Sequence, residues 1–110
     1  MDKLSKTEMN ERLILAVMMG QAHRATTLIK QGANVNAKNA FGRRAIHFSA
    51  IYGDIGTLQL LLSHGAHVNV KDNEGMTPLK IARDRRFQAV CELLVENGAR
   101  ENPWCWQTCW

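Results

Sequence analysis

Apolar residues recur along this chain in six segments of helical length, separated by glycines or by polar turn residues. We therefore expect helices near residues 8–19, 22–31, 45–52, 55–64, 78–85 and 88–97. The longest continuous apolar run, Leu13 to Met19, is far shorter than the roughly 20 residues that span a bilayer. No membrane span is expected.

The pattern repeats itself along the chain. Gly-Ala pairs begin at positions 32, 65 and 98, and the same offset relates Val35 to Val68, Asn36 to Asn69, Gly42 to Gly75 and Gly20 to Gly53. Repetition at one fixed offset is the mark of stacked structural units. We expect one domain over residues 1–103, with repeats at about 5–38, 39–71 and 72–103, followed by a tail at 104–110.

The third unit contains Gly75-Met76-Thr77-Pro78-Leu79-Lys80-Ile81-Ala82 and later a Leu-Leu pair before Gly98-Ala99. The second contains Gly42-Arg43-Arg44-Ala45-Ile46-His47-Phe48-Ser49 and a leucine run before Gly65-Ala66. These segments resemble the ankyrin repeat, whose signature has Thr-Pro-Leu-His-x-Ala after a turn glycine. The resemblance covers roughly residues 8–103. It implies an all-α solenoid of helix–turn–helix units joined by β-hairpin-like loops.

Local residues explain where the helices begin and turn. Thr77 can cap a helix N-terminus, and the next residue is proline, which suits the first helical position. Gly20 and Gly53 allow the chain to reverse within a unit, because glycine adopts positive φ without steric cost. The third unit has Arg86 there, so we expect its turn to be strained or looser. The first unit lacks the leading hairpin, but Ser5 and Glu8 have capping-box spacing.

Composition places the chain among ordinary globular proteins, with 45% hydrophobic and 22% charged residues. The three cysteines, Cys91, Cys105 and Cys109, do not form a disulfide framework, and the N-terminus lacks a secretory signal. A cytoplasmic or nuclear location is therefore expected. The formal charge of +4 favours acidic partners only mildly and does not by itself indicate nucleic-acid binding.

No residue pattern predicts catalysis. The resemblance implies a structural hydrogen-bonding role for His47. His64 and His67 flank a Gly-Ala pair and do not share a helical face, so we expect exposed loop histidines. Cys105 and Cys109 could join a histidine on zinc, but structural zinc sites usually have four clear ligands. Nucleotide-binding and serine-hydrolase motifs are absent. We expect a protein that is not an enzyme and has no cofactor or metal.

The resemblance implies that a partner lies against a concave face, made by the hairpin tips and the exposed ends of the first helices. Transfer by register places twelve residues on this face, four of which are Ala40, Asn73, Glu74 and Asp84. The other eight are the candidate partner-binding residues: Met18, Met19, Phe41, Arg43, Ile51, Tyr52, Met76 and Arg85. Aromatic, methionine and arginine residues are enriched at interfaces. For Phe41 and Tyr52, packing against a neighbouring finger or helix is an equally good explanation.

Basic residues near this face would add positive potential suited to an acidic patch on the partner: Lys38, Arg43, Lys71, Arg83 and Arg85. For any one of them alone, ordinary solvated surface is the better explanation. The leading hypothesis is a non-catalytic module that binds another protein as an adaptor, scaffold or competitive inhibitor.

Two further hypotheses remain. The chain could contact nucleic acid through basic residues and the tail tryptophans Trp104, Trp106 and Trp110, or it could be part of a longer array and share that array's function. The tryptophans could equally cover the open end of the stack or dock on a partner. The sequence does not specify the partner or the oligomeric state.

Overall fold

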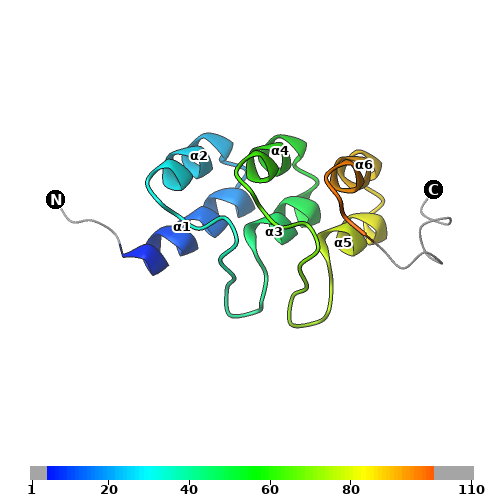
Figure 1. Cartoon of the computed structure of the whole chain (residues 1–110), viewed down its shortest axis with the longest axis horizontal. Helices are drawn as coiled ribbons and strands as arrows, with labels where there is room; N and C mark the ends of the chain where they lie inside the picture. The colour runs from blue at the N-terminus through cyan, green and yellow to red at the C-terminus, as the bar shows by residue number, and fades with distance from the viewer. Residues whose placement is uncertain (1–4, 101–110) are drawn as a thin grey trace.

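The computed structural model describes residues 5–100, which form three helical hairpins stacked side by side (Figure 1). The hairpins contain α1 (Lys6–Met18) with α2 (Ala22–Lys30), α3 (Ala45–Tyr52) with α4 (Ile55–Ser63), and α5 (Pro78–Asp84) with α6 (Gln88–Glu96). Helices α1, α3 and α5 form one row, here called the inner row, and α2, α4 and α6 form the outer row. The six predicted helices are confirmed, and their ends differ from the predicted bounds by at most two residues.

Two loops project from the inner row in Figure 1. We call residues 38–44 the first finger and residues 71–77 the second finger. In the first finger Lys38 and Arg44 form an isolated antiparallel bridge, which closes the base of the loop. The predicted hairpin-like connections are thus present between successive units.

Side-chain caps set the beginnings of three helices. The hydroxyl of Ser5 accepts the N–H of Glu8 at 3.2 Å, and the hydroxyl of Thr77 accepts the N–H of Lys80 at 3.2 Å. The carboxylate of Asp54 caps α4 by accepting the N–H of Thr57 at 3.2 Å. Replacing such a cap with alanine typically costs about 1 kcal/mol.

The turn within each hairpin has a residue in the left-handed conformation. Gly20 has a φ of 72° and Gly53 a φ of 67°, while Arg86 has a φ of 61° at the equivalent position of the third unit. A side chain in this conformation costs roughly 1–2 kcal/mol. The strain expected at Arg86 is therefore present.

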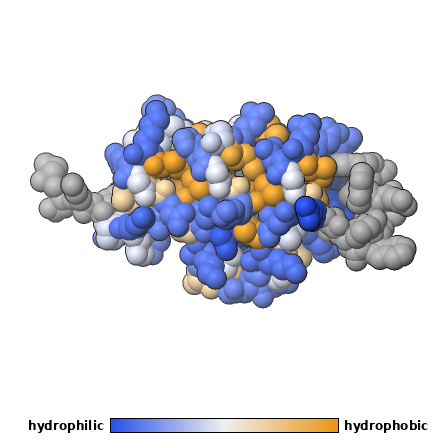
Figure 2. Space-filling view, viewed as in Figure 1, coloured by the Kyte–Doolittle hydropathy of each residue, from blue (hydrophilic) through white to orange (hydrophobic). Residues whose placement is uncertain are grey.

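The core lies between the two rows and between successive hairpins. Register-equivalent residues recur in it: Leu13, Ile46 and Leu79 in the inner row, and Leu28, Leu61 and Leu94 in the outer row. Figure 2 shows an apolar band between the rows, framed by hydrophilic residues over the fingers and the outer helices. Each hairpin therefore buries its apolar face only by contact with its neighbours.

Candidate protein-binding surface

The first finger is shaped by one side chain. The Oδ1 atom of Asn39 accepts the backbone N–H groups of Phe41 at 2.9 Å and of Arg43 at 3.0 Å. The backbone N–H of Asn39 also donates to the carbonyl of Arg43 at 2.9 Å. These bonds hold the tip closed and place the side chain of Phe41 at the end of the finger, 68% exposed.

An aspartate has the same role in the second finger. The Oδ1 atom of Asp72 accepts the N–H groups of Glu74 and of Met76, both at 2.9 Å. Burial raises the pKa of Asp72, but the N–H groups of Met76 and Glu74 and the guanidinium of Arg43 outweigh burial, so the pKa is lower than usual. The ionised carboxylate is therefore a structural part of this finger.

The two fingers are bonded to each other. The backbone N–H of Asn73 donates to the carbonyl of Phe41 at 3.1 Å, and its side-chain Nδ2 donates to the carbonyl of Ala40 at 3.2 Å. A Cβ atom at Gly42 would overlap the side chain of Asn73, so glycine is required at this contact. These contacts therefore join the tips of the two fingers into one continuous surface.

Arg43 connects the same two fingers by charge. Its Nε lies 3.3 Å from Oδ2 of Asp72, and its Nη2 lies 3.4 Å from Oε1 of Glu74. The side chain of Asp72 is 1% exposed, whereas that of Glu74 is 76% exposed. Two carboxylates thus offset the positive potential that the sequence led us to expect at Arg43.

His47 is fully buried beneath the fingers. Its Nδ1 accepts the backbone N–H of Arg44 at 3.0 Å, and its Nε2 lies 3.1 Å from the carbonyl of Val70 and 3.0 Å from that of Met76. Because Nδ1 accepts, the neutral ring carries its proton on Nε2 and donates to these carbonyls. Burial lowers the pKa of His47, outweighing the opposing effects of its backbone hydrogen bonds and of Asp72. The structural role implied for His47 is confirmed.

A cavity of about 460 Å³ lies between α3, α5 and the fingers. Five of the eight candidate residues line it: Arg43, Ile51, Tyr52, Met76 and Arg85. Phe48 and Ile81 add apolar surface, and Asp72, Glu74 and Asp84 add carboxylates. We call this cavity the inner groove. Tyr52 is 54% exposed there, so local packing covers only part of its ring.

The other three candidates lie elsewhere. Phe41 is at the tip of the first finger, and Met18 and Met19 are at the end of α1, with 38% and 67% exposure. Met19 lines a second cavity of about 540 Å³ on the first hairpin, together with Leu15. The structure therefore does not bring these three residues into the inner groove.

Two apolar residues of the groove were not among the candidates. Phe48 and Ile81 are 6% and 7% exposed, so their apolar character alone indicates core. Both are equivalent in register to Leu15, but its 54% exposure in the first hairpin is visible only in the structure, so the sequence does not single these residues out.

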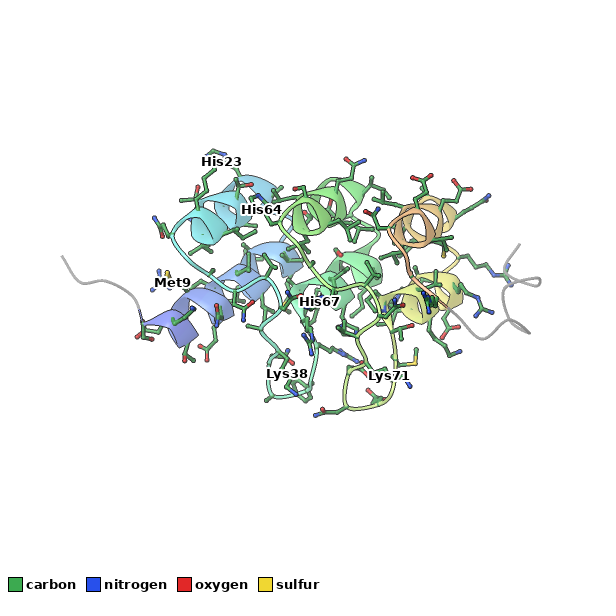
Figure 3. All side chains as sticks on the ribbon, in the orientation of Figure 1. Met9, His23, Lys38, His64, His67 and Lys71 are labelled. Carbon is green, nitrogen blue, oxygen red and sulfur yellow. The ribbon has the colours of Figure 1, made fainter. Side chains whose placement is uncertain are left out.

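The remaining polar candidates are spread over the surface. His64 and His67 are both exposed, as expected, and Lys38 and Lys71 occupy equivalent places at the bases of the two fingers (Figure 3). Within residues 5–100, no three His, Cys, Asp or Glu side chains are grouped to hold a metal. The zinc candidates Cys105 and Cys109, and the tail tryptophans, lie outside the described residues.

None of the helices in the described part of the chain combines the length and the apolar character needed to cross a bilayer.

The family described as "Ankyrin repeats (3 copies)" matches the chain over residues 13–103. The chain belongs to the ankyrin-repeat family. Human ankyrin repeat and SOCS box protein 16 is 35% identical over 97 residues, which cover 88% of this chain and 21% of that protein. The putative E3 ubiquitin-protein ligase XBAT35 of Arabidopsis thaliana is 38% identical over 108 residues, covering 94% of this chain and 22% of that protein.

Human Rabankyrin-5 is 39% identical over 94 residues, which cover 81% of this ankyrin chain and 8% of that protein. The chain thus spans about a fifth or less of the length of these relatives. Ankyrin repeats in general are non-catalytic and mediate contacts between proteins. The predicted family and the all-α solenoid are confirmed.

Proposed function

We propose that this chain is a non-catalytic module that holds a partner protein against its concave face, formed by the two fingers and the inner row. The observation that carries the proposal is the inner groove, where Ile51, Tyr52, Met76 and Arg85 converge although they come from two repeats. The groove offers both apolar surface and charge at its rim, as protein interfaces do.

The exposed side chains at this face suit a protein partner energetically. Tyr52 and Arg85 belong to the residue types most enriched among interface hot spots. Tyr52 offers a half-exposed ring, and covering apolar surface contributes about 25 cal/mol per Å² removed from water. A partner that fills the groove would gain this free energy of burial and lose little of it to ordering the surface, because hydrogen bonds between the fingers already hold the surface in place.

The groups that could perform chemistry beneath the face are engaged in structure. Both ring nitrogens of His47 are hydrogen-bonded to backbone, and the buried carboxylate of Asp72 is held by two N–H groups and by Arg43. A general base needs a nitrogen or oxygen within reach of a substrate proton. This supports binding without catalysis.

The same contact would serve an adaptor, a scaffold or a competitive inhibitor, in the cytoplasm or the nucleus. These roles differ in whether a second protein binds at the same time. The runner-up function, nucleic-acid binding, is less well supported, because Asp72, Glu74 and Asp84 line the groove. Nucleic acid would need continuous positive potential there.

An affinity capture from cell lysate tests the proposal. The wild-type chain is compared with the triple variant Phe41→Ala, Tyr52→Ala and Arg85→Ala, and with a control triple variant in the outer row, Lys30→Ala, Gln59→Ala and Glu92→Ala. All six side chains are exposed, and unchanged helical circular dichroism is required first.

The proposal predicts proteins that are captured by wild type and control but lost with the triple variant of the concave face. Equal capture by all three chains would exclude the concave face. Recovery of nucleic acid alone, with affinity that falls steeply as salt rises, would favour the runner-up.

A further inference from the structure

The chemistry of the concave face changes along one line of register-equivalent positions. Met19, Tyr52 and Arg85 are 33 residues apart in sequence and end the three inner helices. Met19 and Tyr52 are 67% and 54% exposed, and Arg85 is exposed too. The line therefore runs from an apolar side chain through an aromatic ring to a cation.

The charges around the inner groove are unevenly paired. Arg43 is bound to Asp72 and Glu74, and Asp84 lies 3.6 Å from the ammonium group of Lys80. Among the ion pairs of residues 5–100, none includes Arg85. Arg85 thus presents at the groove a guanidinium that forms no ion pair with a carboxylate of these residues.

Resting on the function proposed above, we infer that the inner groove selects an extended segment of its partner that carries a large apolar side chain with a carboxylate close by in sequence. The apolar side chain sits against Ile51, Tyr52 and Met76, and the carboxylate binds Arg85. Guanidinium and carboxylate groups can form two parallel hydrogen bonds, which makes this pair specific.

The spacing follows from the packing of the inner helices. Packed helices lie about 8–10 Å apart, and an extended chain rises about 3.3 Å per residue. One repeat therefore corresponds to about three residues of an extended segment, and the apolar residue and the acid are expected within about three residues of each other.

Other positions of the groove would reject an acid. The side chain of Glu74 is 76% exposed and that of Asp84 is 54% exposed, so a carboxylate placed near either one meets a like charge. Like charges brought together across an interface are unfavourable. The groove therefore favours a carboxylate beside Arg85 and disfavours one beside Glu74 or Asp84. A segment with acidic residues throughout would bind less well.

The inference is tested by selecting random peptides displayed on phage against three forms of the full chain. These are wild type, Arg85→Glu in the groove, and Lys30→Glu in the outer row, which makes the same change of charge at an exposed side chain. Wild type and Lys30→Glu should enrich a large apolar residue with Asp or Glu nearby. Arg85→Glu should enrich Lys or Arg in place of the acid.

A selected peptide is then measured by fluorescence anisotropy. Its affinity should fall about tenfold or more with Arg85→Glu, the range expected when one member of a charge pair is reversed. A peptide with lysine in place of its acid should regain affinity for Arg85→Glu, whereas Lys30→Glu should leave both peptides unaffected. If affinity is restored when both charges of the pair are exchanged, residue 85 contacts the peptide directly, and a general change in the charge of the chain does not explain the result.

Failure of the inference can be separated from failure of the proposed function. Peptides that bind without an acid, keep their affinity for Arg85→Glu, and lose it with Tyr52→Ala would overturn the charge pairing and leave the groove as the binding site. Peptides whose affinity is changed neither by Arg85→Glu nor by Tyr52→Ala would overturn both proposals. If no peptide is enriched, the groove does not select an extended segment, and the lysate capture alone decides the broader function.

Discussion

The side-chain oxygen of Asn10 accepts a hydrogen bond from the backbone N–H of Asn34 at 2.7 Å. The equivalent backbone group of the next unit, the N–H of His67, donates at 2.8 Å to the side chain of Asn36. Asn36 lies in the loop that precedes a finger, whereas Asn10 lies in α1. In the first unit a helical asparagine thus supplies the acceptor that a loop asparagine supplies in the second.

Asn36 and Asn69 each hold the following unit at two points. The amide of Asn36 donates to the carbonyl of Gly65 at 3.3 Å, and that of Asn69 donates to the carbonyl of Gly98 at 3.0 Å. The side-chain oxygen of Asn69 also accepts the N–H of Arg100 at 2.8 Å. These bonds connect units 1 to 2 and 2 to 3, in a fold that is stable only through contacts between neighbours.

We predict that Asn36→Ala lowers the free energy of unfolding by about 1–2 kcal/mol, because two hydrogen bonds to backbone are lost at a partly exposed site. Urea unfolding followed by circular dichroism measures the change. Gln59→Ala, at an exposed position of α4, is the control and should cost less than about 0.5 kcal/mol. Equal effects of the two substitutions would contradict a role for Asn36 between units.

The buried imidazole of His47 makes stability depend on pH. Its pKa in the folded state is lower than the ordinary value of 6.5. The unfolded chain therefore binds more protons as pH falls through 6.5, and stability that is fully present above this pH is progressively lost below it. Urea unfolding at pH 7.5 and pH 5.5 should show the lower stability at pH 5.5.

His47→Asn identifies the group responsible. The variant should be less stable than wild type at pH 7.5, because Asn cannot reach all three backbone partners. It should also show a smaller loss of stability between the two pH values. A loss as large as in wild type would assign the pH dependence to another group.

The two fingers provide an internal comparison for Asp72. Asn39 closes the first finger with the same pair of backbone hydrogen bonds, so Asp72→Asn should keep the turn and lose only the charge pairing with Arg43. We expect Asp72→Asn to cost about 1 kcal/mol and Asp72→Ala about 2–3 kcal/mol, since alanine leaves the N–H groups without an acceptor. Thermal and urea unfolding should rank the variants in this order; the reverse order would contradict the turn role.

Arg86 is a site where substitution should stabilise the chain. Its φ of 61° costs a residue with a side chain roughly 1–2 kcal/mol, and glycine avoids this cost. After allowing for the greater freedom of glycine when unfolded, we expect Arg86→Gly to raise stability by about 0.5–1 kcal/mol. Arg86→Ala keeps the strain and should have little effect. A stabilising effect of alanine equal to that of glycine would point to charge rather than backbone.

The helices, the turns and the caps at Ser5 and Thr77 could be predicted from the sequence because their determinants are local or periodic. Ser5, Thr77 and Pro78 mark helix starts, and the 33-residue period places the three units in register. The hydrogen bond between the side chain of Asn10 and the backbone of Asn34 could not be predicted in this way. The register partner of Asn10 is Arg43, a finger residue, so the period gives no sign that Asn10 replaces a loop asparagine of the other units.

The inner groove was predictable in part. The family resemblance places Ile51, Tyr52 and Arg85 on one face, and the structure brings them together. The pairing of Arg43 with Asp72 joins residues 29 apart and depends on how closely the two fingers approach. That distance is set by tertiary packing, so the sequence indicated positive potential at Arg43 and gave no sign of the ion pair.

The most direct test of the central claim is site-specific photo-crosslinking at the inner groove. A photoreactive phenylalanine is introduced in place of Tyr52 and, in a separate chain, in place of Gln59 on the outer row, and each is irradiated with the proteins captured from lysate. The account predicts a covalent adduct with a captured protein from position 52 and none from position 59. An adduct from position 59 alone would show that the partner lies on the outer row and would contradict the account.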